Sequence, residues 1–97
     1  MKINDITEIK HFNLGTINQN KIVIQRANGG AILYFSYNTL VGIEWSQNGY
    51  NRKYISHNYW TKTTGKLLNK LEPNKDKRKN TENFKMATDA MFAFLNS

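Results

Sequence analysis

The stretch that decides the fold is residues 21–37, KIVIQRANGGAILYFSY. Residues 21–26 are short and rich in β-branched side chains, which is typical of a β-strand. The Asn-Gly-Gly sequence at 28–30 predicts a tight turn, because Asn and Gly tolerate positive φ. Residues 31–37 then form the partner strand, and both of its alternating faces are largely apolar. The pattern predicts a central strand that is covered on both sides.

Two further strands are predicted after this hairpin. Residues 40–45 read as a third strand that ends at the Ser-Gln-Asn-Gly sequence, and residues 52–56 return as a fourth. Consecutive strands joined by tight turns form an antiparallel meander. We therefore expect a β-rich region over about residues 9–60.

The first residues are compatible with two structures. Ile3, Ile6 and Ile9 recur at three-residue spacing, and Asp5 is placed to cap a short helix. Residues 9–17 read equally well as an extended segment. We expect a short helical turn followed by a strand.

A helical period begins after residue 60. Thr63 or Thr64 is placed to cap a helix over about residues 64–72, and Pro73 ends it. The apolar stripe of this helix consists of Leu67, Leu68 and Leu71. A leucine stripe at this spacing faces a core.

A second helix is predicted over residues 81–95, after a basic linker at 74–80. Asn80 or Thr81 is placed to cap it. Its apolar face is wider than one stripe, so it either docks on the sheet or is partly given to a protein partner. The candidate interface residues are Met91, Phe92, Phe94 and Leu95. The fold class is α+β: one domain over residues 1–97, with an antiparallel meander of three to five strands packed against two C-terminal helices.

The positive charge is concentrated in one segment. The net charge is +7, and residues 46–81 hold nine basic and two acidic side chains, whereas the segments on either side are nearly neutral. Such a segment attracts phosphate backbones, or it is simply a solvated face.

No motif in the sequence indicates catalysis or a metal site. The Thr-Thr-Gly-Lys sequence at 63–66 lacks the first glycine of a phosphate loop, so it is either a plain helix cap or a site for one phosphate. There is no Cys, and His11 and His57 lack further metal ligands at a suitable spacing. No apolar run is long enough to span a bilayer. We expect a cytoplasmic protein that is not an enzyme, has no cofactor and does not bind membranes.

Aromatic and basic residues alternate between positions 50 and 70. Rings stack on bases and cations meet phosphates, although a strand also alternates rings inward and cations outward. Arg52, Lys53, Lys62 and Lys66 are expected to form one basic surface near the junction of the last strand and the first helix. The candidate nucleic-acid or partner-binding residues are Arg52, Lys53, Tyr59, Trp60, Lys62, Thr63, Thr64, Lys66, Lys70, Lys77, Arg78 and Lys79.

Two segments resemble small uncharacterised proteins of phages and other mobile elements. These are residues 35–42, FSYNTLVG, and residues 59–69, YWTKTTGKLLN. The family pattern is a Ser-Tyr-x-Thr strand end followed by a Thr-Thr-x-Lys helix start. The chain has Leu67 where the family often has His, and the resemblance transfers no catalytic residue.

The resemblance implies an accessory protein of a phage or mobile element. The expected function is a non-catalytic basic binding protein that contacts nucleic acid or a host nucleoprotein in the bacterial host cell and antagonises host defence, in the manner of an anti-CRISPR or anti-restriction protein. The alternative is a protein–protein inhibitor or homo-oligomeric adaptor, for example a homodimer, that uses the apolar C-terminal helix and binds no nucleic acid.

Overall fold

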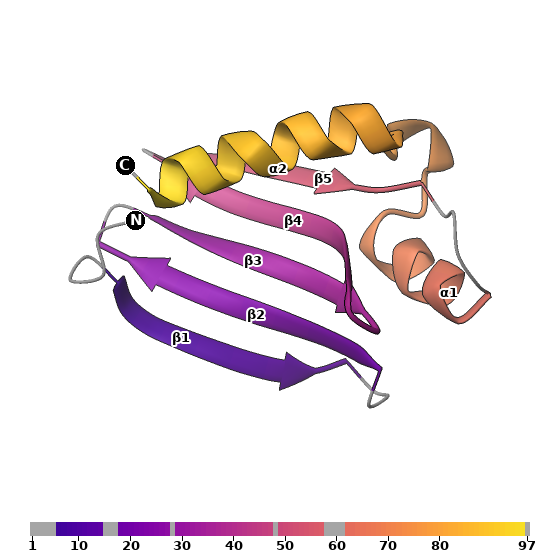
Figure 1. Ribbon diagram of the computed structural model, residues 1–97, viewed down its shortest axis with the longest axis horizontal. Helices are drawn as coiled ribbons and strands as arrows, with labels where there is room; N and C mark the ends of the chain where they lie inside the picture. Colours follow the sequence, from indigo (N-terminus) through magenta and orange to yellow (C-terminus); the bar gives the residue numbers. More distant parts are fainter. Residues whose placement is uncertain (1–5, 15–17, 28, 48, 58–61, 97) are drawn as a thin grey trace.

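The computed structural model describes residues 6–14, 18–27, 29–47, 49–57 and 62–96. Five antiparallel strands form one sheet in the order of the chain, which confirms the predicted α+β meander (Figure 1). The strands are β1 (Ile6–Asn13), β2 (Gln19–Arg26), β3 (Gly29–Ser36), β4 (Thr39–Gln47) and β5 (Tyr50–Ile55).

The N-terminal segment is a strand from Ile6 onward, so the prediction of a helical turn reaching Ile9 is wrong. Ile9 pairs with Ile24 of β2, and the pairing runs to Asn13. The three-residue spacing of the isoleucines suggested a helix, but pairing with the β-branched strand β2 determines the structure. Ile3 and Asp5 lie outside the described residues.

Two helices follow the sheet. They are α1 (Lys62–Leu71) and α2 (Thr81–Leu95), and a short 3₁₀ helix, η2 (Lys75–Lys77), lies between them in the predicted linker. The start of α2 is as predicted, because Asn80 Oδ1 accepts a hydrogen bond from the Asn83 amide at 2.8 Å.

The predicted cap of α1 is wrong, because the helix already begins at Lys62 and both candidate threonines lie in its first turn. Thr64 is buried there, and its Oγ1 lies 2.8 Å from Ser36 Oγ on β3. This hydrogen bond between the Thr64 and Ser36 hydroxyls holds α1 against the sheet.

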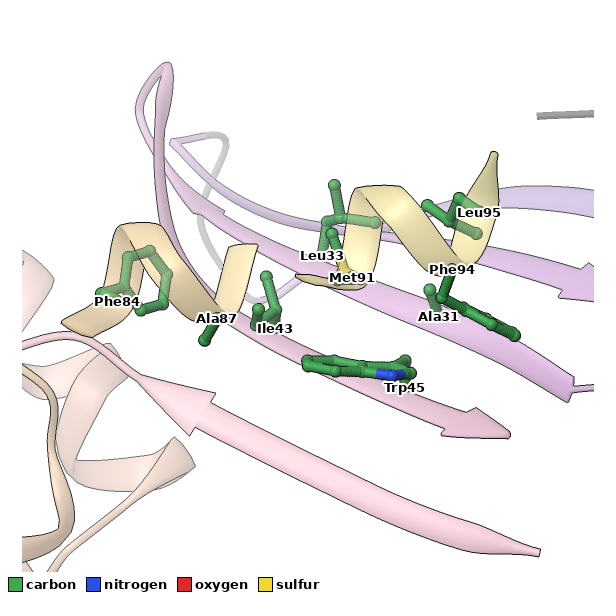
Figure 2. Close-up of a cluster of buried hydrophobic side chains, with 9 residues drawn as sticks. All are labelled: Ala31, Leu33, Ile43, Trp45, Phe84, Ala87, Met91, Phe94 and Leu95. Atoms are coloured by element: carbon green, nitrogen blue, oxygen red, sulfur yellow. The ribbon is translucent and has the colours of Figure 1, made fainter. Parts of the chain in front are cut away.

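Helix α2 covers one face of the sheet. Ala31 and Leu33 of β3 and Ile43 and Trp45 of β4 point toward it, and their cross-strand partners share this face. Figure 2 shows the cluster, whose helix residues are Phe84, Ala87, Met91, Phe94 and Leu95. Arg26 fixes the end of the helix to β2, because its Nη1 donates to the Phe94 carbonyl at 2.6 Å.

Helix α1 covers one end of the opposite face. Its buried Leu67 and Leu68 pack with Tyr34, Val41 and Ile55. Val41 reaches this side because the register shifts between Tyr34 and Phe35, which inserts one extra residue into β4. Strand β3 therefore contributes Leu33 to one core and Tyr34 to the other, as the pattern at 31–37 predicted.

The chain passes from β5 around to α2 through a closed junction. Ser56 and Lys79 form an isolated parallel bridge. The Lys79 amide donates to the Ile55 carbonyl at 2.7 Å, and the His57 amide donates to the Lys79 carbonyl at 2.8 Å. The segment that carries α1 and η2 thus leaves and returns at one point beside β5.

Candidate functional site

The sheet face that carries α1 is hollowed where α1 does not cover it. The hollow has a volume of about 570 Å³ and is lined by β2, β3, β4 and β5. No residue of α2 lines it, although the Phe94 ring lies close to Gly29 on the other face. The strand register places the following lining residues on the hollowed face of the sheet: Val23, Gln25, Gly30, Ile32, Glu44, Ser46, Asn51 and Lys53.

The floor and rim of the hollow follow from the strand register. Val23 pairs with Ile32, Ile32 with Glu44, and Glu44 with Lys53. Residues directly opposite one another share a face of the sheet. An apolar floor from β2 and β3 therefore meets a carboxylate and then an exposed cation toward the β5 edge.

Tyr34 and Glu44 connect the hollow to α1. Tyr34 Oη donates a hydrogen bond to Glu44 Oε2, and Tyr34 itself is buried in the α1 cluster. Burial raises the pKa of Tyr34 far above its usual value, and the hydrogen bond to Glu44 and the negative charge of Glu44 raise it further. The phenol therefore stays protonated and holds the carboxylate at the edge of the hollow.

The sheet separates the basic side chains of β5. Lys53 shares the hollow's face, whereas Arg52 lies on the α2 face, with its guanidinium carbon 5.7 Å from the centre of the Trp45 ring. Lys79 also belongs to the α2 side, because its Nζ lies 5.9 Å from the centre of the Tyr54 ring. The expected single basic surface is thus divided between two faces.

Helix α1 and η2 present further cations to solvent. Lys66 and Lys70 are exposed and lie four residues apart on α1, so they share a helical face. Leu67 and Leu68, which lie between these lysines in the sequence, are buried in the core. Lys77 of η2 is exposed as well. Lys53, Lys66 and Lys70 form no ion pair with another described residue.

A family model matches residues 1–86, which include the whole sheet, α1 and η2. The chain belongs to DUF8033, a family of unknown function. No curated protein and no solved structure matches the chain. Both the hollow and the exposed cations of α1 lie inside the part of the chain that defines DUF8033.

Two predicted contact residues of this DUF8033 chain are buried. Thr64 is bonded to Ser36, as described above, and only 6% of Arg78 is exposed. Arg78 Nε donates to the Glu72 carbonyl at 3.0 Å, and its Nη2 donates to Asn69 Oδ1 at 2.6 Å. Thr64 holds α1 against the sheet, and Arg78 ties α1 to the segment that follows it, so neither side chain belongs to a contact surface.

The structure does not describe the side chains of four other predicted contact residues. Tyr59 and Trp60 lie outside the described residues, and so do the side chains of Lys62 and Thr63.

The proposed interface on α2 is reduced to one residue. Met91, Phe94 and Leu95 are buried in the cluster shown in Figure 2, because they point at β3 and β4. Phe92 is 42% exposed. The wide apolar face of this helix is therefore explained by its contact with the sheet.

Sequence reasoning missed the cations that β1 and β2 place on the same face of the sheet as the hollow. Lys10 pairs with Val23 on that face, and Lys21 lies over the Phe12 ring, 5.2 Å from its centre. These cations stand in a segment whose net charge is almost zero, so counting charges passes over them. Once this segment is recognised as a strand, the two-residue spacing of Glu8 and Lys10 places both on one side of it.

Within the described ranges, no helix is long and apolar enough to cross a bilayer. Among the same residues, no three His, Asp or Glu side chains are grouped so that they could hold a metal ion.

Arg78→Ala is expected to lower the free energy of unfolding by about 2–3 kcal/mol, because it leaves Asn69 Oδ1 and the Glu72 carbonyl without a charged donor. Urea denaturation monitored by circular dichroism measures the change. Lys77→Ala, one residue away and exposed, is the control and should change stability by less than about 0.5 kcal/mol. Equal effects of the two substitutions would contradict a structural role for Arg78.

Proposed function

We propose that this protein is a non-catalytic nucleic-acid-binding module of a phage or another mobile element. It contacts a single-stranded segment, free or within a host nucleoprotein, through the hollow and the cations beside it. The observation that carries the proposal is that Lys53 is exposed at the rim of an open hollow with an apolar floor. The exposed Lys66 and Lys70 lie on α1, which covers the other end of the same sheet face, and none of the three lysines forms an ion pair with another described residue. The mobile-element origin rests on the resemblance of residues 35–42 and 59–69.

The cations supply the affinity for nucleic acid. Lysines that neutralise phosphates release condensed counterions, so binding is strong at low salt and weakens as salt rises. The net charge of +7 adds attraction at longer range. A polyanion that lies over the hollow can meet Lys53, and one that extends along the same sheet face continues toward the end that α1 covers, where Lys66 and Lys70 are exposed.

The hollow favours unpaired bases over a duplex. Val23 and Ile32 offer an apolar floor to the flat face of a base, and Gln25, Ser46 and Asn51 offer hydrogen-bonding groups around it. A duplex keeps its bases stacked inside, where a sheet face cannot reach them. We therefore expect single strands to bind more tightly than duplex DNA of equal length.

A salt series with two matched variants tests this proposal. The first variant replaces Lys53, Lys66 and Lys70 with Gln, and the second replaces Arg52, Lys79 and Lys85 with Gln. Each loses three positive charges, but the first loses them on the sheet face that carries the hollow and α1, and the second loses them on the α2 side. Fluorescence anisotropy with labelled single-stranded DNA, single-stranded RNA and duplex DNA gives Kd at several salt concentrations.

The unmodified chain and the second variant are expected to show the same slope of log Kd against log salt. The first variant should lose about 2–3 from the magnitude of that slope, at 0.7 to 0.9 for each lost phosphate contact. Absence of binding at low salt would refute the function. Equal losses in the two variants would show that net charge alone, rather than this face, attracts the nucleic acid.

A further inference from the structure

The two edges of the sheet differ in their chemistry. β1 and β5 are the edge strands, and an edge strand leaves a row of backbone amides and carbonyls unpaired. Figure 1 shows α2 running along the β4 and β5 side of the sheet, away from β1. No described element pairs with the outer side of β1.

The sequence of β1 is self-complementary. When a second copy of the strand is laid antiparallel with Ile9 opposite Ile9, Glu8 of each copy falls opposite Lys10 of the other. A twofold axis through this point is perpendicular to the sheet, so both copies keep α2 on the same face. Opposite charges directly across a strand pair stabilise it. Centring the pair one residue later, on Lys10, would bring two lysines together.

The exposed side chains of β1 fit this pairing. Ile9 is 60% exposed in the single copy, and it would be covered by its counterpart. Lys10 and Glu8 already attract each other on one strand, with Nζ and Oε1 2.7 Å apart. A second strand adds the same two charges in reverse order and produces an alternating group of four. A register shift between Ile6 and Glu8 leaves the strand regular from Glu8 onward.

The β5 edge opposes the same arrangement. Its exposed residues include Arg52 and Lys53, and antiparallel pairing of two β5 strands would bring these cations near each other. Like charges across a strand pair destabilise it. Self-association through β1 is therefore favoured over self-association through β5.

We propose that β1 pairs antiparallel with β1 of a second copy of this chain, centred on Ile9, and so joins two sheets into one of ten strands. The partner is identified by charge complementarity alone, so the proposal does not depend on nucleic-acid binding. It also replaces the apolar C-terminal helix as the surface for a homodimer.

Cysteine crosslinking tests the geometry directly, since the chain contains no Cys. Ile9→Cys places two thiols opposite each other across the twofold axis, within reach of a disulfide. Tyr50→Cys, at the exposed start of β5, is the matched control. Under mild oxidation, the first variant should become a covalent dimer and the second should not. Crosslinking of Tyr50→Cys without Ile9→Cys would overturn the proposal.

Charge exchange tests the pairing energy and separates it from folding. Glu8→Lys and Lys10→Glu each create two like-charge pairs across the axis, so each should raise the dimer Kd at least about tenfold. The double variant Glu8→Lys/Lys10→Glu should restore the original Kd, and an equimolar mixture of the single variants should form heterodimers. Sedimentation over a concentration series measures these equilibria, with circular dichroism to confirm folding. A monomer at all concentrations, or a dimer that ignores these substitutions, would refute the proposal.

Discussion

Gly29→Ala is expected to lower the free energy of unfolding by about 4 kcal/mol. Gly29 has a φ of +139°, which L side chains rarely adopt. An added Cβ would lie 2.0 Å from the Ser46 carbonyl oxygen, which belongs to the backbone of β4. Because that oxygen is part of a paired strand, it cannot move without opening the β3–β4 ladder. Chemical denaturation of both proteins gives the difference.

Gly49→Ala is the matched control for this substitution. Gly49 also has a positive φ, +83°, but nothing lies within 4 Å of its added Cβ. It should therefore cost only the backbone strain of a left-handed residue, about 1 kcal/mol. A Gly29→Ala effect no larger than that of Gly49→Ala would show that the contact with Ser46 is relieved at little cost.

Leu68→Ala is expected to lower the free energy of unfolding by about 3 kcal/mol. Leu68 is fully buried between α1 and the sheet, against Tyr34, Val41 and Ile55. Its removal withdraws apolar surface and leaves a cavity under α1, where this helix covers the sheet. Urea denaturation gives the overall loss, and hydrogen exchange shows whether the α1 amides open first.

Leu71→Ala serves as the comparison on the same helix. Leu71 is only partly buried, although it lies near Gly42. Its truncation should therefore cost about 1–2 kcal/mol. If Leu71→Ala proved as costly as Leu68→Ala, the docking of α1 would not depend on the buried leucine in the way the packing implies.

The parts of the fold that were predictable are those whose signal is local. The β-branched run before the Asn-Gly-Gly sequence gave β2 and β3, and the apolar period with Asn80 as cap gave α2. The start of β1 was missed because its apolar residues recur every three residues, as in a helix, and only pairing with β2 makes Ile9 part of a sheet. The start of α1 was missed because the partner of Thr64 is Ser36, which stands 28 residues earlier.

The residues of the candidate site also divide into those that local sequence places correctly and those whose position depends on distant partners. That Arg52 and Lys53 point to opposite faces follows from their adjacency, and the pairing of β4 with β5 confirms it. Arg78 stands in a basic run that reads as solvated, yet its partners Glu72 and Asn69 lie six and nine residues away and bury it. A hollow across four strands depends on long-range register, which residue types alone do not specify.

The bridge between Ser56 and Lys79 makes the part of the chain between them a closed excursion. The two ends of this segment meet beside β5, where backbone hydrogen bonds from Lys79 to Ile55 and from His57 to Lys79 join the start of α2 directly to the sheet. Because lengthening an already closed loop costs little entropy, insertions at the exposed residues of η2, which make no contact with the buried core, should leave the sheet and α2 intact. The same segment carries the exposed lysines of α1, so substitutions at these exposed positions can change the surface charge while the buried contacts between α1 and the sheet are kept.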